Sequence, residues 1–274
     1  MKYRIPVQIF GIRPIALLYL FLSVALLSAQ GCVPEPCCAT PPSPYQQDDA
    51  GYQPPDTGYQ PPQGSKLLNI RPVAQQTAVW CWAATAEMVF RYYDLPNVNP
   101  AENYQCGIVS LYYGPNSACW GDCYVCESGI GPISQLQQLV NLYGVYANNL
   151  TPSPLFVPSP VLRSTLIFSA LTFSDAAQEI DSDRPIIAGI SPSQYSYPNF
   201  SQHFVVIVGY MDSGSSQTII VDDPFPYDLF PTQTNPYFAV GATSSQPGRF
   251  EVSYLKLVAQ LQWGNTLYGI DKIQ

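Results

Sequence analysis

A cysteine in the run Gln75-Gln76-Thr77-Ala78-Val79-Trp80-Cys81-Trp82-Ala83-Ala84 has the surroundings of a nucleophile. Apolar residues recur every three to four positions over 79–93, which predicts a helix that begins near Cys81. The positive end of a helix dipole favours the thiolate, the nucleophilic form of cysteine. Gln75, six residues upstream, could donate its amide to an oxyanion together with the Cys81 N–H; Gln76 is the rival for this role. A buried structural cysteine is the alternative interpretation.

The only histidine of the chain, His203, is the one candidate base for such a nucleophile. It opens a β-branched run, a Ser- and Gly-rich turn follows at 211–217, and the next strand ends at Asp222-Asp223-Pro224. Hairpin pairing would bring the end of the second strand beside the start of the first. Strand alternation allows only one of Asp222 and Asp223 to face the imidazole. Taken singly, a lone histidine and a turn after a strand are both common structural features.

Four cysteines fall within one short segment: Cys106, Cys119, Cys123 and Cys126. A zinc site would favour two Cys-x2-Cys pairs, and only Cys123 and Cys126 have that spacing. A redox Cys-x2-Cys pair is the second interpretation. We favour two disulfides, as expected in an oxidising compartment, and the sequence leaves their three pairings open.

The elements that would position these groups are helices first and strands afterwards. Helices are predicted over 79–93, over Pro132–Tyr143 with Gly144 at the end, and from a Ser174 cap to near Asp181. Strands are predicted over 186–190, 203–210, 218–222 and 250–258. This order predicts an α+β fold.

The N-terminal residues have the pattern of export. Three basic residues and an apolar run over 15–27 predict a signal peptide, 1–31, with an uncleaved membrane anchor as the alternative. Ser28-Ala29-Gln30-Gly31-Cys32 resembles a bacterial lipoprotein signal, so lipid attachment at Cys32 and plain secretion are both open. Residues 32–66 are rich in Pro, Gln and Tyr and predict a spacer, followed by one domain over 67–274.

Composition excludes several classes of function. The formal charge of −8 and the pI near 4.4 are unfavourable for binding nucleic acid, which needs Lys and Arg to neutralise phosphates. A single histidine excludes zinc sites built from several histidines. We expect no metal or organic cofactor, and the sequence leaves the oligomeric state open.

Three motifs occur in order along the chain: Gln-x5-Cys-Trp-Ala-Ala from Gln75, Arg-Pro-Ile-Ile-Ala-Gly-Ile at 184–190, and the run from His203 to Tyr210 followed by Asp-Pro. Together they resemble the papain-like cysteine peptidases, in particular a bacterial branch that includes secreted effector peptidases and bacteriocin-leader peptidases. Where members of the family commonly have Gly before the His, this chain has Gln202. The resemblance implies a helical part, with the nucleophile helix, packed on a C-terminal antiparallel sheet.

The resemblance also implies roles: Gln75 as oxyanion residue, Cys81 as nucleophile, His203 as base and Asp223 as orienting acid. We therefore expect an exported cysteine peptidase that acts on a protein or peptide, in the bacterial cell envelope or secreted. One alternative is a deamidase or transglutaminase with the same triad. The other is a non-catalytic surface-binding lipoprotein, for which the low charge and the Pro-rich spacer would also be suitable.

Overall fold

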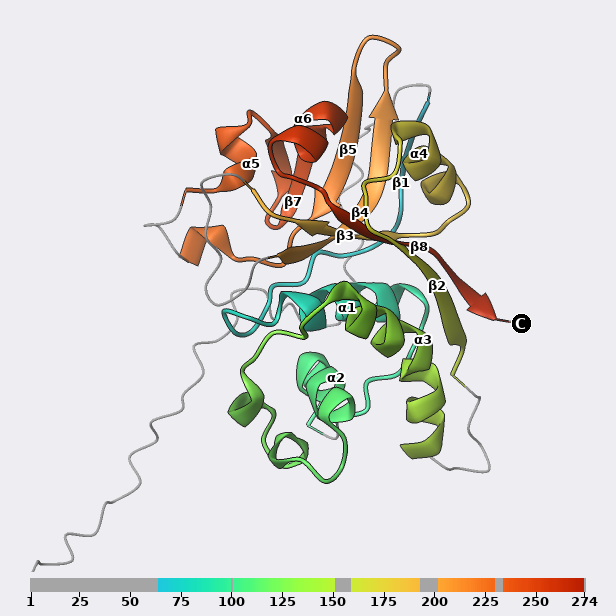
Figure 1. Ribbon diagram of the computed structural model, residues 1–274, viewed down its shortest axis with the longest axis vertical. Helices are drawn as coiled ribbons and strands as arrows, with labels where there is room; N and C mark the ends of the chain where they lie inside the picture. Colours follow the sequence, from blue (N-terminus) through green and yellow to red (C-terminus); the bar gives the residue numbers. More distant parts are fainter. Residues whose placement is uncertain (1–63, 100, 151–158, 193–201, 230–233, 274) are drawn as a thin grey trace, which may run out of the picture. The chain divides into compact units, whose positions relative to one another are not determined.

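The computed structural model describes residues 64–99, 101–150, 159–192, 202–229 and 234–273 (Figure 1). The predicted signal peptide, Cys32 and the spacer up to residue 63 lie outside the described residues. Strand β1 begins at Ser65, so the sheet starts two residues before the predicted domain boundary at 67. Among the described residues, no helix combines the length and the apolar character needed to cross a membrane.

The described residues form α-helices, short 3-10 helices and strands. The α-helices are α1 (Cys81–Tyr92), α2 (Tyr104–Tyr113), α3 (Ile133–Leu150), α4 (Phe173–Asp181), α5 (Pro236–Ala239) and α6 (Tyr254–Ala259). The 3-10 helices are η1 (Ala118–Trp120), η2 (Cys123–Cys126) and η3 (Tyr227–Leu229). The strands are β1 (Ser65–Leu67), β2 (Val161–Ile167), β3 (Ile186–Ile190), β4 (His203–Asp212), β5 (Gln217–Asp222), β6 (Thr243–Gln246), β7 (Arg249–Ser253) and β8 (Asn265–Ile273).

Within the described ranges the strands form one eight-stranded sheet in the order β2-β8-β3-β4-β5-β7-β6, with β1 paired to β4. Every neighbouring pair is antiparallel. Strands β4 and β5 form the predicted hairpin, in which Asp222 lies opposite Val206 near the start of β4. The predicted α+β class is therefore confirmed, with the helices α1 to α3 gathered on one side of the sheet (Figure 1).

Helix α1 packs on strand β4 through a buried apolar surface, because ten of its residues, Cys81–Phe90, are buried. Thr85 lies one turn after Cys81, and its hydroxyl donates a hydrogen bond of 3.0 Å to the carbonyl of Phe204. A buried hydroxyl must find such a partner, so this bond fixes the helix against the strand. It joins the neighbourhood of Cys81 to the residue that follows His203.

The prediction that Gly144 ends a helix is wrong, because α3 continues through it to Leu150. A Cβ atom at Gly144 would lie 2.1 Å from the carbonyl oxygen of Pro160. Glycine is therefore needed for the close approach of the segment before β2 and not for a turn. The expected Ser174 cap is also wrong, since the side chain of Thr172 caps α4 by accepting from the Asp175 N–H.

Two further elements differ from the predictions. The strand expected over 250–258 ends at Ser253, and the chain then turns into helix α6. Helix α2 was not predicted, because it is buried on nearly all sides and has little amphipathic periodicity. Its one local signal is Asn103, whose side chain accepts from the Cys106 N–H and caps the helix.

Candidate active site

Cys81 is the first residue of α1 and is 3% exposed. The preceding residue, Trp80, makes no side-chain cap, so its side chain does not cover the first N–H groups of the helix. A sulfur at this point experiences the positive end of the helix dipole. Among the described residues, Cys81 is the only cysteine outside a disulfide.

His203 is fully buried at the start of β4, between a thiol and a carboxylate. Its Nε2 lies 2.6 Å from Oδ1 of Asp223, and its ring also interacts with the side chain of Cys81. Burial lowers the pKa of His203, but the charge and hydrogen bond of Asp223, together with Cys81, outweigh burial and raise the pKa to about 10. The structure therefore favours an imidazolium at neutral pH.

Asp223 is held by three donors. Its Oδ1 accepts from His203 Nε2 and, at 2.7 Å, from the Phe225 N–H, while Oδ2 accepts at 2.9 Å from the Tyr227 hydroxyl. The Phe225 ring lies edge-on to the imidazole at 6.2 Å between ring centroids. These contacts fix the carboxylate and cover the His203–Asp223 pair with apolar surface, which strengthens their interaction.

Asp222 faces a different partner. Its carboxylate accepts from Arg249 at 2.7 and 2.8 Å, and the same guanidinium donates at 2.6 Å to the carbonyl of Ile70. Asp222 and Arg249 lie directly opposite each other on β5 and β7, which places both side chains on one face of the sheet. Of the two consecutive acids, the structure brings only Asp223 to the histidine.

The two glutamines are also distinguished by their positions. Gln75 is buried: its backbone N–H donates to the Pro224 carbonyl at 2.8 Å, and its Nε2 donates to the Thr77 carbonyl at 2.8 Å. Gln76 is exposed, and its Oε1 accepts from Asn103 Nδ2 at 2.9 Å and from the Tyr124 hydroxyl at 3.1 Å. The segment with Gln75 is thus bonded directly to the Asp-Pro turn.

The four clustered cysteines form two disulfides, Cys106–Cys123 and Cys119–Cys126. This pairing uses all four thiols, so the zinc and redox interpretations do not apply. Elsewhere in the described ranges, no group of three His, Cys, Asp or Glu side chains could hold a metal ion. The sequence pattern left the pairing open, and the tertiary structure selects one of three.

The disulfide-linked segment contacts both tryptophans beside Cys81. Trp80 Nε1 donates to the Cys126 carbonyl at 3.3 Å, and Trp82 Nε1 donates to the Ser128 carbonyl at 3.1 Å. The Tyr124 ring stacks on Trp80 with 5.4 Å between centroids. No local sequence pattern predicted these contacts, because the partners are more than forty residues apart.

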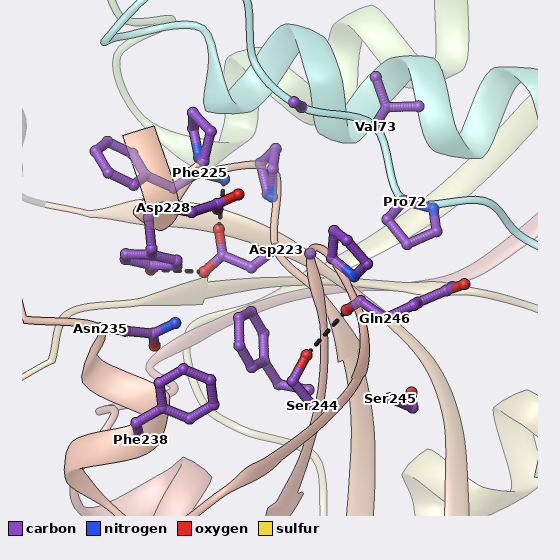
Figure 2. A pocket seen from close by; sticks show the side chains of 17 residues that line it. Pro72, Val73, Asp223, Phe225, Asp228, Asn235, Phe238, Ser244, Ser245 and Gln246 are labelled. Carbon is purple, nitrogen blue, oxygen red and sulfur yellow. Dashed lines mark hydrogen bonds between the residues drawn. The ribbon is translucent and has the colours of Figure 1, made fainter. Parts of the chain in front are cut away.

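A pocket of about 470 Å³ borders Asp223 (Figure 2). Its walls are mainly apolar and include Pro72, Phe225, Phe238 and Phe250. Figure 2 shows the Asp223 carboxylate bonded within this wall, and neither Cys81 nor His203 lines the pocket. The pocket therefore adjoins the carboxylate end of the cluster and not the sulfur.

A thiol at a helix start, an imidazole and a buried carboxylate, placed on an α+β fold, are the arrangement that cysteine peptidases use. Residues 67–239, more than half of the chain, match the model of the Peptidase_C39 like family. The chain therefore belongs to the Peptidase_C39 like family. No curated protein sequence matches it.

Solved structures with a similar fold include peptidase precursors. Procathepsin L2 from Tenebrio molitor larval midgut has 15% identity and a TM-score of 0.40, covering 72% of this chain and 64% of that one. A structure concerning the mite allergens Blo t 1 and Der p 1 has 12% identity and a TM-score of 0.44, covering 82% of this chain and 75% of that one. This chain thus spans 64% of the length of the procathepsin L2 chain.

Proposed function

We propose that this chain is an exported cysteine peptidase that hydrolyses peptide bonds in a protein or peptide substrate. The observation that carries the proposal is the buried His203, which interacts with Cys81 on one side and lies 2.6 Å from Asp223 on the other. A structural histidine needs no adjacent thiol at a helix start. Membership of the Peptidase_C39 like family supports the same activity.

In the proposed acylation step, the Cys81 thiolate attacks the carbonyl carbon of the scissile peptide and a C–S bond forms. The carbonyl π electrons move to oxygen, and this oxyanion accepts from the Cys81 N–H and from the Gln75 amide. The Gln75 amide would exchange its bond to the Thr77 carbonyl for one to the oxyanion. The His203 imidazolium then gives its proton to the leaving amine as the C–N bond breaks.

In the proposed deacylation step, neutral His203 takes a proton from water, and the resulting oxygen nucleophile attacks the thioester. The C–S bond breaks, the carboxylic acid leaves, and the Cys81 thiolate and the His203 imidazolium are restored. Asp223 would hold the imidazole in one orientation and stabilise its charged form throughout. No group outside the described cluster is needed for these proton transfers.

The test is hydrolysis of fluorescently labelled casein by the wild-type chain and by Cys81→Ala. We expect new peptide N-termini with the wild type and none with the variant. The variant should unfold at nearly the same temperature as the wild type, because only the thiol is removed. Undiminished turnover by Cys81→Ala would overturn the assignment of the nucleophile. Release of ammonia without new N-termini would instead favour deamidation or transglutamination, and failure of iodoacetamide to label Cys81 at neutral pH would favour a binding protein.

Export is proposed from the sequence alone, and attachment at Cys32 has its own test. The chain is expressed in a bacterium fed radiolabelled palmitate, beside a Cys32→Ser variant. Label in the wild-type chain that is lost in the variant supports a lipid anchor. Unlabelled protein recovered from the medium supports plain secretion, and a cytoplasmic product with an intact N-terminus contradicts export.

A further inference from the structure

One side chain of helix α2 binds the backbone on both sides of Gln75. Gln105 is 1% exposed; its Oε1 accepts from the Gln76 N–H at 3.0 Å, and its Nε2 donates to the Ala74 carbonyl at 2.9 Å. The carboxamide thus pairs with the carbonyl before residue 75 and with the N–H after it. A neighbouring β-strand would pair with backbone groups in a similar way. The polar groups involved are buried or partly buried, so leaving them unpaired would be unfavourable.

The orientation of this carboxamide is itself fixed. Gln105 Nε2 also donates to Oε2 of Glu87 at 3.1 Å, and Oε1 of Glu87 accepts from Arg91 Nε at 2.8 Å. An ionised carboxylate can only accept, so the nitrogen of Gln105 must face Glu87 and the oxygen must face the Gln76 N–H. Glu87 lies on α1, the helix that begins at Cys81. The amide is therefore oriented relative to the nucleophile helix.

The opposite side of the segment is held as well. The Gln75 N–H donates to the Pro224 carbonyl at 2.8 Å, next to Asp223. Helix α2 is in turn connected to η2 by the disulfide from Cys106, the neighbour of Gln105. The backbone at Gln75 thus lies between two anchored elements, one of which also carries the carboxylate partner of the histidine.

We infer that Gln105 is a positioning residue for the oxyanion site: it fixes the backbone around Gln75 so that the Gln75 amide can reach the oxyanion. This inference rests on the proposed function, in which Gln75 donates to that oxyanion. Gln105 acts through Gln75 and touches neither the sulfur nor the imidazole in any contact of the described residues. Its loss should therefore affect turnover more than the reactivity of the thiol.

The experiment uses the full chain with Gln105→Met, which keeps the shape but removes both backbone bonds. Gln105→Glu is a second variant, in which a carboxylate faces the Ala74 carbonyl and Glu87. Gln137→Met is the matched control, because Gln137 Nε2 also donates to a backbone carbonyl, that of Ser164 at 2.9 Å, outside the cluster. Thermal unfolding shows whether each variant is folded.

Casein hydrolysis by Gln105→Met should show a fall in kcat on the order of 10- to 100-fold, the range expected for a displaced catalytic group, with KM nearly unchanged. Alkylation of Cys81 by iodoacetamide should proceed at the wild-type rate, because displacement of iodide builds no oxyanion. Gln137→Met should match the wild type in both measurements. An unchanged kcat in folded Gln105→Met, or a parallel loss of alkylation, would overturn the inference.

A double variant separates the inference from the proposed function. If Gln105 acts through Gln75, adding Gln105→Met to Gln75→Ala should lower kcat no further than Gln75→Ala alone. Additive losses would overturn the positioning role. A wild-type kcat for Gln75→Ala, while Cys81→Ala is inactive, would refute the oxyanion role within the proposed function. A lower kcat for Gln75→Ala with an unchanged kcat for Gln105→Met would refute the positioning role of Gln105 and leave the oxyanion role of Gln75 intact.

Discussion

The pairing of His203 with Asp223 predicts a large change in the titration of the histidine when the carboxylate is removed. Asp223→Asn is nearly isosteric, and its oxygen can still accept from His203 Nε2 while its amide faces the Tyr227 hydroxyl. The variant removes one buried charge and keeps the shape of the site. We therefore expect it to fold and to retain the geometry of the ring.

The magnitude follows from the contacts of the imidazole. The pKa of His203 is raised from its ordinary value of 6.5 to about 10, and the charge of Asp223 is the largest of the causes that raise it. An opposite charge in direct contact shifts a pKa by about 1–3 pH units, or roughly 1.4–4 kcal/mol. We expect the pKa of His203 in Asp223→Asn to fall by that amount. The variant lacks the negative charge that raises this pKa, while burial still lowers it.

Nuclear magnetic resonance gives this pKa directly, since the chain has a single histidine and its ring signals need no assignment. The imidazole shifts are followed from pH 5 to pH 10.5 in wild type, Asp223→Asn and the control Asp228→Asn. Asp228 lies in the same segment and is exposed, so its charge should matter little. The alkaline limb of kcat/KM for casein should move with the histidine pKa.

The same pKa fixes the sign of a stability effect. Because the pKa of His203 is raised on folding, its contribution to the free energy of unfolding is fully present below pH 6.5 and is lost as the pH rises through about 10. Asp223→Asn should therefore be less stable than wild type near pH 7. Equal histidine pKa values in wild type and folded Asp223→Asn would refute the whole electrostatic argument, as would an equal shift in Asp228→Asn.

Three further changes test contacts around the site by urea unfolding. Arg249→Met leaves the buried Asp222 carboxylate unpaired and should lower the free energy of unfolding by about 3–5 kcal/mol. Since burial raises the pKa of Asp222 to about 6, this loss of stability should be largest above that pH, where the carboxylate is charged. A loss that does not depend on pH would contradict this reasoning. Joint Cys119→Ser and Cys126→Ser opens a short loop and should cost about 2–3 kcal/mol, whereas unchanged stability under oxidising conditions would contradict the pairing. Thr85→Val removes the bond from α1 to β4 and should cost about 1–3 kcal/mol; a more stable variant would show that this hydroxyl is not needed there.

Local patterns predicted those elements whose signals are contained within a few consecutive residues. The β-branched run at 186–190 and the hairpin of β4 and β5 were predicted because alternation and turn composition are local properties. Helix α2 was missed since its nearly complete burial removes the amphipathic period. Gly144 was misinterpreted as a helix end, because its close contact with the Pro160 carbonyl comes from packing between elements.

The sequence itself determined the order of a thiol, an imidazole and a carboxylate along the chain. It also excluded any other histidine as the base, because the chain has only one. Only the tertiary structure decided that Asp223 and not Asp222 contacts His203, because Arg249 on a neighbouring strand takes the other acid. The tertiary structure also places the backbone around Gln75 between Gln105 and Pro224, through hydrogen bonds to residues far away in the sequence. Side-chain identity is a local property, whereas the face that a side chain presents depends on strand register and on packing between distant elements.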